Sequence, residues 1–139
     1  MPTTPSTIIA LDVGEKRIGV ARARTDVRIA ASLTTLINDE NIWQTLEDLL
    51  GSEQPTTLVV GLPRGLEGQD TAQTRTTQGF IEKLQQHVGI PIHMQDEALT
   101  SVKAEQELEK RGKPYAKSDI DALAATYILE DYLSEREDA

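Results

Sequence analysis

The fold is decided by residues 7–22, whose sequence is TIIALDVGEKRIGVAR. Two apolar runs rich in β-branched residues flank a polar turn, a pattern that predicts two antiparallel strands joined by a tight turn. Side chains alternate between the two faces of a strand, so Asp12 shares one face with Ile8 and Ala10, and residues 9, 11 and 13 take the other. Both faces are apolar, and we therefore expect other elements to cover both of them.

Asp12 is the unusual residue of this stretch. A lone carboxylate at the end of a strand that is covered on both faces is costly to desolvate unless a cation or hydrogen-bond donors meet it. Two interpretations are open. Either the carboxylate accepts N–H bonds from the turn at Gly14, as aspartates before glycines often do, or it binds a metal ion at the tip of the strand.

Length and composition bound the class of protein. The 139 residues, 38% of them hydrophobic, suit one domain over residues 1–139, with flexible ends at about residues 1–6 and 135–139. There is no apolar run long enough to span a membrane and no signal-peptide pattern, so we expect a cytoplasmic protein. The chain has no cysteine and only two histidines. Any metal ion would therefore be held by oxygen ligands.

The formal net charge of −9 argues against a general nucleic-acid coat, because phosphate contacts need Lys and Arg. The basic residues are nevertheless grouped in the first strand pair, after the next apolar strand and around one late loop. A local basic groove could form from these groups. The residues that we expect to bind nucleic acid are Lys16, Arg17, Arg22, Arg64, Arg75, Lys113 and Lys117, with Lys110 and Arg111 beside them.

Hydrophobic spacing and turn residues predict seven further elements. In chain order they are a strand over 28–37, a helix over 40–50 that stops at Gly51, a strand over 57–63, a helix between 69 and 87, a strand over 90–97, a helix from Thr100 or Ser101 to about 110, and a helix from about Ser118 to Ser134. This order predicts an α/β fold. Three antiparallel strands are followed by parallel ones in a mixed five-stranded sheet, with helices on both faces.

Acidic residues recur where such sheets place their sites, beyond the carboxyl ends of the strands. Asp12 lies at one such end, and Asp96 and Glu97 lie at another. Adjacent strand residues point to opposite faces, so only one of Asp96 and Glu97 can approach Asp12, and the pattern alone leaves open which one.

The start of the last helix offers a third carboxylate. Ser118 and Asp121 fit a capping box with Asp in place of Glu, and the acidic residues there could also simply favour the helix dipole. Asp121 shares its stripe with small apolar residues such as Ala125, whereas Asp119 aligns with Glu130. Asp121 is therefore the better candidate for an inward-facing carboxylate.

Three inward carboxylates repel one another, and cations relieve that repulsion. Oxygen clusters suit Mg²⁺ or Mn²⁺, and two such ions about 4 Å apart activate water and stabilise the leaving oxygen in phosphodiester hydrolysis. In this interpretation Asp12 bridges two ions, and Glu97 and Asp121 each hold one. Asp96 and Asp119 are the weaker candidates.

Four segments in this order resemble the YqgF (RuvX) family over nearly the whole chain. They are DVGEKRIGVA at 12–21, GLPRGLEG at 61–68, DEALTS at 96–101 and DALAATYIL at 121–129. The resemblance implies a ribonuclease H-like fold. It also implies a hydrolase of the bacterial cytoplasm with catalytic acids at Asp12, Glu97 and Asp121. Members are described as Holliday junction resolvases and as pre-16S ribosomal RNA nucleases. The family usually has Arg where this chain has Ala98, which could weaken a phosphate contact.

The expected function is metal-dependent cleavage in 5′-end processing of pre-16S ribosomal RNA, a step of ribosome biogenesis. Holliday junction resolution on branched DNA is the alternative, and it would call for a homodimer, whereas a monomer would favour RNA. A non-catalytic nucleic-acid-binding module with the same fold is an alternative of another class. The loop over 61–71 either cradles phosphate with its amides and Arg64 or uses its glycines only to turn. An Asp-x-Gly hairpin also opens two-domain ATPases, but 139 residues supply only one domain.

Overall fold

The structure is a computed structural model that describes residues 4–98 and 100–136. Its elements in chain order are β1 (Thr7–Val13), β2 (Arg17–Arg24), β3 (Ala31–Ile37), α1 (Ile42–Glu53), β4 (Thr57–Pro63), α2 (Ala72–Gln85), β5 (Ile92–Glu97), α3 (Thr100–Arg111) and α4 (Lys117–Glu135). The five strands form one sheet in the order β3-β2-β1-β4-β5. The predicted α/β class and the mixed sheet are confirmed.

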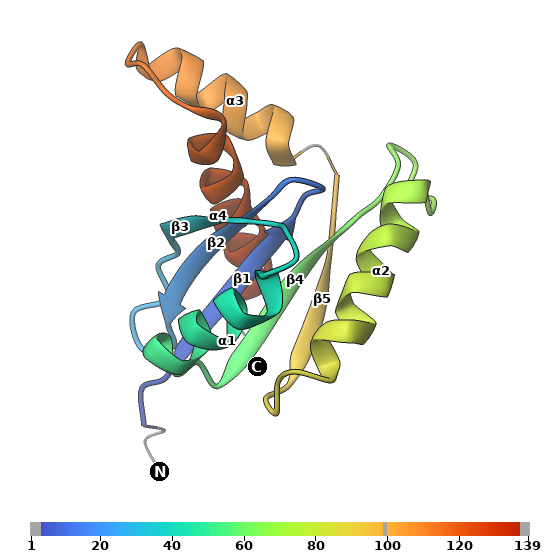
Figure 1. Ribbon diagram of the computed structural model, residues 1–139. Helices are drawn as coiled ribbons and strands as arrows, with labels where there is room; N and C mark the ends of the chain where they lie inside the picture. The colour runs from blue at the N-terminus through green and yellow to red at the C-terminus, as the bar shows by residue number, and fades with distance from the viewer. Residues whose placement is uncertain (1–3, 99, 137–139) are drawn as a thin grey trace.

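β1 is the central strand, and both of its faces are covered, as its sequence predicts. It pairs with β2 in the antiparallel and with β4 in the parallel direction. Ile8 and Ala10 pack in a cluster with residues of α4, whereas Ile9 and Leu11 pack in a second cluster with residues of α1 and α2. Figure 1 shows α1 and α2 on one side of the sheet and α4 on the other. Asp12 consequently points toward the α4 side.

Two glycines let α4 lie directly on the sheet. A Cβ atom at Gly19 would sit 1.9 Å from the backbone oxygen of Asp121, and one at Gly61 would sit 2.4 Å from Cδ1 of Ile128. Gly19 is the cross-strand partner of Asp12 in the β1–β2 ladder. The absence of side chains at these positions therefore determines how closely the start of α4 approaches the tip of β1.

Two predicted element boundaries and one predicted helix cap are wrong. β3 begins at Ala31, because Arg28 has a positive φ of 59° in the turn before it. α1 does not stop at Gly51 but continues to Glu53 and ends at Gln54, which adopts the left-handed conformation. α4 begins at Lys117, and the carboxylate that caps it belongs to Asp119, whose Oδ2 accepts the N–H of Ala116 at 2.8 Å. The Ser118–Asp121 capping box does not form, because the earlier start makes Asp119 the third residue after the cap.

α3 packs on α4 and not on the sheet, so that it projects from one end of the molecule (Figure 1). Ala104, Leu108, Leu123 and Ala124 form a small separate core between these two helices. The ends that we expect to be flexible, 1–6 and 135–139, lie mostly outside the described residues. Within the described part, the N–H of Ser6 donates a hydrogen bond to Thr25 Oγ1 at 3.0 Å. Within 4–98 and 100–136, no helix has the length and apolar character needed to cross a bilayer.

Candidate active site

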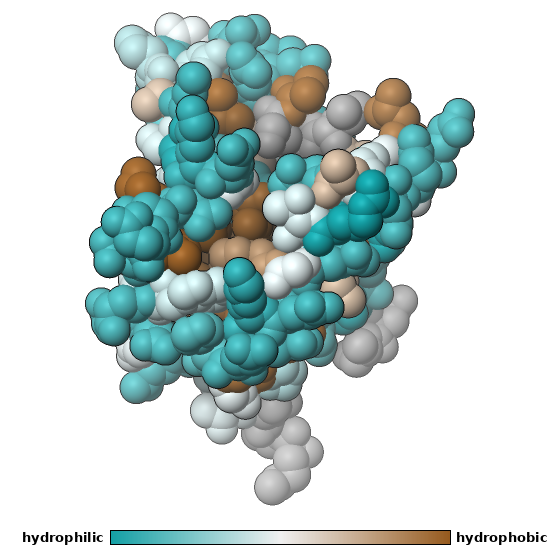
Figure 2. Space-filling model, turned by 45° about the vertical axis from the view of Figure 1, so that its right-hand side comes forward, coloured by the Kyte–Doolittle hydropathy of each residue, from teal (hydrophilic) through white to brown (hydrophobic). Residues whose placement is uncertain are grey.

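A cavity of about 350 Å³ opens where β1, β4 and β5 end and α4 begins. Asp12, Glu97 and Asp121 all line it, so the fold brings together the three carboxylates that the sequence singled out. Its other walls include Gly14, Gly61, Arg64 and Val102. Figure 2 shows this end of the molecule, where the surface is hollowed between α3 at the top and α2 at the right.

Asp12 reaches the cavity from the end of the central strand. Its burial, together with the negative charge of Asp121, raises the pKa of the Asp12 carboxyl to about 6. The turn beyond it is closed without this side chain, because the N–H of Gly14 donates to the carbonyl of Arg17 at 2.9 Å. The interpretation in which Asp12 caps the turn at Gly14 is therefore wrong.

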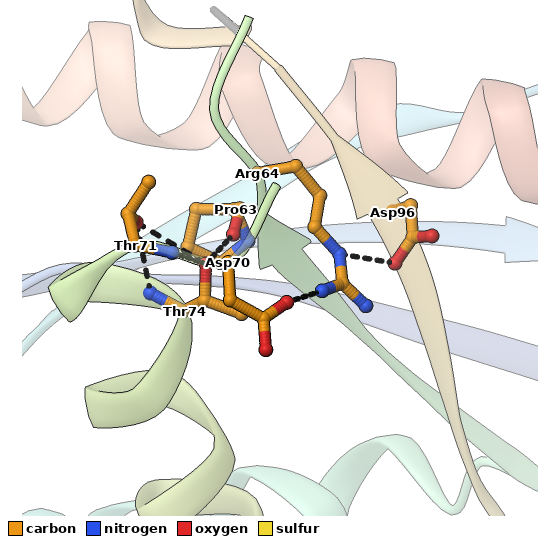
Figure 3. A network of polar contacts seen from close by, with 6 residues as sticks. All are labelled: Pro63, Arg64, Asp70, Thr71, Thr74 and Asp96. Atoms are coloured by element: carbon orange, nitrogen blue, oxygen red, sulfur yellow. Dashed lines mark hydrogen bonds and ion pairs between the residues drawn. The ribbon is translucent and has the colours of Figure 1, made fainter. Parts of the chain in front are cut away.

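Glu97 is the member of the Asp96–Glu97 pair that faces the cavity. Its residue is only 9% exposed, and in the described part of the chain its Oε1 atom is buried without a hydrogen-bond partner. Burial and the carboxyl group of Asp131 on α4 raise the pKa of Glu97 to about 9. Asp96 points away and accepts a hydrogen bond from Arg64 Nε at 3.1 Å (Figure 3). Adjacent strand residues point to opposite faces, and the register of β5 against β4 places Glu97, not Asp96, on the face of the cavity.

Asp121 enters the cavity from the first turns of α4, where the close approach at Gly19 holds it beside β1. Its Oδ2 accepts a hydrogen bond from Nε of Arg17 at 2.5 Å, which makes a partly buried ion pair. Asp119 does not reach this cavity. It caps α4 and lines a separate cavity with Arg111, Lys113 and Tyr115.

The three carboxylates suit a hard divalent cation by their chemistry. The orphaned, buried Oε1 of Glu97 is the kind of atom that a cation would satisfy. Asp12 is half-buried, and the negative charge of Asp121 contributes to the raised pKa of its carboxyl. In their present positions, however, the described residues contain no group of three acidic or histidine side chains close enough to hold an ion. Asp121 is instead engaged by Arg17. The donor set fits Mg²⁺ or Mn²⁺, provided that the Asp121 carboxylate changes partner.

Several amides of the loop between β4 and α2 are already bonded to other groups of the protein. The N–H of Gly65 donates to Gln69 and that of Gly68 to Gly65, both at 2.9 Å, while the N–H of Arg64 donates to the carbonyl of Glu97 at 2.8 Å. These bonds favour the interpretation in which the glycines serve the turns. The Arg64 guanidinium lies between Asp70 and Asp96 and borders the cavity, as Figure 3 shows.

The other basic residues are spread over the molecule. Arg22 is paired with Glu53 at 2.6 Å and lies level with Ile9, on the sheet face opposite Asp12. Lys113 lines the separate cavity described above, together with Arg111, which pairs with Glu107 at 2.5 Å. Lys16, Arg75, Lys110 and Lys117 are exposed. Of the basic residues expected to bind nucleic acid, the structure places Arg17 and Arg64 against the candidate site.

Two functional features escape the sequence reasoning. The Arg17–Asp121 ion pair joins residues 104 positions apart, and no local pattern signals it. Asp131 faces Glu97 and lies three residues after Ile128, which packs over Gly61. That helical spacing could have placed the exposed Asp131 on the side of α4 that turns toward Glu97.

The raised pKa values predict that the metal-free protein loses stability as pH rises. For Asp12 and Glu97 the folded pKa exceeds that of the unfolded chain, so folding favours the protonated forms. Their contribution is complete below about pH 4 and declines through about pH 6 for Asp12 and about pH 9 for Glu97. Urea unfolding in chelator between about pH 7 and pH 9 should show a decline that Glu97→Gln removes. The exposed Glu67→Gln is the matched control, and equal slopes in wild type and Glu97→Gln would contradict the assignment.

Solved structures define the class of fold. The chain superimposes on Thermus thermophilus RuvC in complex with a Holliday junction substrate, with a TM-score of 0.56 and 17% identity. The match covers 94% of this chain and 96% of the RuvC chain. The fowlpox virus Holliday junction resolvase matches 96% of this chain and 99% of its own, with a TM-score of 0.53 and 14% identity. Identities this low show a shared fold alone. The architecture is the ribonuclease H-like fold.

Sequence comparison then gives the family. A family model described as "RuvX: Holliday junction resolvase" matches residues 6–135. A relative from Chloroflexus aurantiacus is 43% identical, and the match covers 93% of this chain and 87% of the relative. A relative from Sulfurihydrogenibium is 38% identical, and the match covers 92% of this chain and 90% of the relative. Both carry the name "Putative pre-16S rRNA nuclease". The chain belongs to the RuvX family.

Proposed function

We propose that this protein is a nuclease that hydrolyses phosphodiester bonds at the cavity lined by Asp12, Glu97 and Asp121. The observation that carries the proposal is the convergence of three carboxylates from distant segments on one cavity, two of them with raised pKa values. The names of the relatives point to pre-16S ribosomal RNA as the substrate. We propose that the chain cuts it at the 5′ end, in the cytoplasm.

Each group has a distinct task in this proposal. Asp12, Glu97 and Asp121 would hold two Mg²⁺ or Mn²⁺ ions, which when bound supply an activated water and stabilise the leaving oxygen. At neutral pH Glu97 releases its proton as it takes up the cation, because a carboxyl must be ionised to bind it. Arg64, at the border of the cavity, positions a phosphate of the substrate. The chain has Ala98 where its family usually has Arg, so Arg64 has a larger share of the phosphate contact.

A cleavage assay tests the proposal. An end-labelled RNA that spans the 5′ end of mature 16S RNA should be cut in Mn²⁺ and left intact in chelator, and Glu97→Gln should remove the cleavage. Glu67→Gln, a substitution of the same kind on an exposed loop residue, should cut like wild type. Binding of the RNA without metal-dependent cleavage would contradict the nuclease and favour the non-catalytic module.

Junction resolution is the second candidate, because the family description names it and the fold is that of RuvC. Two strands of a junction must be cut symmetrically, which calls for a two-fold dimer with two sites. A four-way DNA junction in the same assay, together with light scattering, separates the candidates. Paired cleavage of the junction by a dimer would favour resolution, whereas cleavage of RNA alone by a monomer supports RNA processing.

Binding of the substrate should depend steeply on salt and on Arg64. Each phosphate contact that is lost flattens the slope of log K against log salt by roughly one unit, so Arg64→Gln should reduce that slope by about one. Arg22→Gln is the matched control, since Arg22 is also ion-paired but lies on the other face of the sheet. Fluorescence anisotropy of a labelled RNA at several salt concentrations measures both. If Arg64→Gln leaves the salt slope unchanged, or if Arg22→Gln reduces it equally, the RNA does not bind at Arg64 as proposed.

A further inference from the structure

Arg17 is a charged residue beside the candidate site that has no task in the proposed nuclease function. Its Nε atom donates to Asp121 Oδ2 at 2.5 Å, and the two side chains are 32% and 18% exposed. Among the described residues, Asp121 is thereby the one carboxylate of the three that forms an ion pair. Arg17 comes from the first residue of β2, directly after the hairpin turn whose Gly14 and Glu15 line the same cavity.

This ion pair makes Arg17 a competitor for the metal ion. A divalent cation that takes up Asp121 must replace the hydrogen bond from Arg17 or weaken it, because both bind the same carboxylate. Once released, the guanidinium stays near the cavity, since the backbone of Arg17 is paired with Ile37 of β3 and its carbonyl accepts the N–H of Gly14 at 2.9 Å. A guanidinium free of its carboxylate presents a planar set of N–H donors that matches the oxygens of a phosphate.

We propose that Arg17 exchanges partners: it neutralises Asp121 in the metal-free protein and binds a phosphate of the substrate when the ion is present. The proposal rests on the proposed nuclease function for the identity of the second partner. In this exchange the metal ion and the nucleic acid bind with positive coupling. The ion frees Arg17 for the phosphate, and the phosphate holds Arg17 away from Asp121. The two roles of Arg17, as a competitor of the metal ion and as a partner of the phosphate, can be measured separately.

The first measurement is the affinity for Mn²⁺ without nucleic acid, by titration calorimetry. Arg17→Gln removes the competitor and should tighten Mn²⁺ binding about tenfold, while lowering the melting temperature in chelator. Arg22→Gln, which breaks another arginine ion pair of the same strand, should leave the Mn²⁺ affinity unchanged. In an Asp121→Asn background, Arg17→Gln should no longer tighten binding. A purely structural ion pair predicts instead that Arg17→Gln lowers the melting temperature equally with and without Mn²⁺ at constant affinity, which would overturn the proposal.

The second measurement is the salt dependence of RNA binding, in chelator and in Ca²⁺. Wild type and Arg17→Gln should share one slope in chelator, where Arg17 is held by Asp121, and differ by about one unit in Ca²⁺. Asp121→Asn removes the other member of the ion pair, and it tests the proposal even if Arg17→Gln fails to fold. It frees Arg17 without any ion and should steepen the slope in chelator by about one unit. No such increase, or an equal loss in Arg17→Gln under both conditions, would overturn the exchange.

These outcomes are separable from the cleavage assay. Tighter Mn²⁺ binding by Arg17→Gln in a protein that cuts neither RNA nor DNA supports the competitor role and contradicts the nuclease. Metal-dependent cleavage by wild type with unchanged Mn²⁺ affinity in Arg17→Gln supports the nuclease and contradicts the exchange.

Discussion

Asp12→Asn is expected to reduce metal-dependent cleavage by at least about a hundredfold, equivalent to roughly 3 kcal/mol in the barrier. The amide keeps the shape of the side chain but loses the charge that would hold the ions. Asp48→Asn is the matched control, because Asp48 is exposed on α1, which covers the other face of the sheet, and it should leave cleavage within about threefold of wild type. The measurement is the single-turnover rate on labelled RNA at saturating Mn²⁺.

The same substitution should not destabilise the metal-free protein. Burial raises the pKa of Asp12 to about 6, so the ionised carboxylate is held at a cost at neutral pH. Removing it should leave unfolding in chelator unchanged or stabilise the protein by up to about 3 kcal/mol, and stabilisation by added Mn²⁺ should shrink. If Asp12→Asn melts lower than wild type in chelator and still cuts at the wild-type rate, Asp12 has a structural role and the assignment of the site is wrong.

Gly19→Ala is expected to destabilise the protein by about 3 kcal/mol or more. Its Cβ would meet the backbone oxygen of Asp121 at 1.9 Å and the backbone nitrogen of Ala122 at 2.9 Å. Backbone atoms cannot rotate away as a flexible side chain can, so the start of α4 has to lift from β2. Urea unfolding measures the loss. Mn²⁺ affinity and cleavage should fall further than the unfolded fraction explains, because Asp121 moves with the helix.

Gly51→Ala provides the contrast for this prediction. Gly51 lies inside α1 with no atom within 4 Å of its hypothetical Cβ. Alanine should therefore stabilise α1 by about 0.5–1 kcal/mol, because it loses less conformational freedom on folding. A loss of stability at Gly19→Ala no larger than about 0.5 kcal/mol would mean that α4 tolerates displacement, and the close approach would not position the site.

The parts of the site that depend on local periodicity could be predicted from the sequence. Alternation along β1 places Asp12 on the α4 face, and helical spacing places Asp121 on the inner stripe of α4. Both predictions follow from the chemistry of a few neighbouring residues. The choice between Asp96 and Glu97 needed the register of β5 against β4, in which Glu97 is level with Pro63. Register depends on long-range pairing, which spacing alone does not reveal.

The parts that depend on charge pairing across the fold could not be predicted. Arg22 looks like Arg17 in the sequence, since both follow the same hairpin, but they lie on opposite faces and pair with acids from different helices. The cap of α4 was assigned to Ser118 because hydroxyl side chains favour that position, and the carboxylate of Asp119 instead bonds the N–H of Ala116. In both cases partners from several elements compete, and only their positions in space decide the outcome.

The position of α4 in the chain has a consequence for the protein's own synthesis. α4 supplies Asp121 and covers the sheet face to which Asp12 and Glu97 point, yet it is made after all five strands. A growing chain folds from its N-terminal part onward, so β1, β4 and β5 can pair in that order before α4 has left the ribosome. The acidic cavity closes only once residues through Glu135 are free to dock. A protein that we propose to cut ribosomal RNA would thus lack a finished site for as long as it is threaded through the particle that makes it.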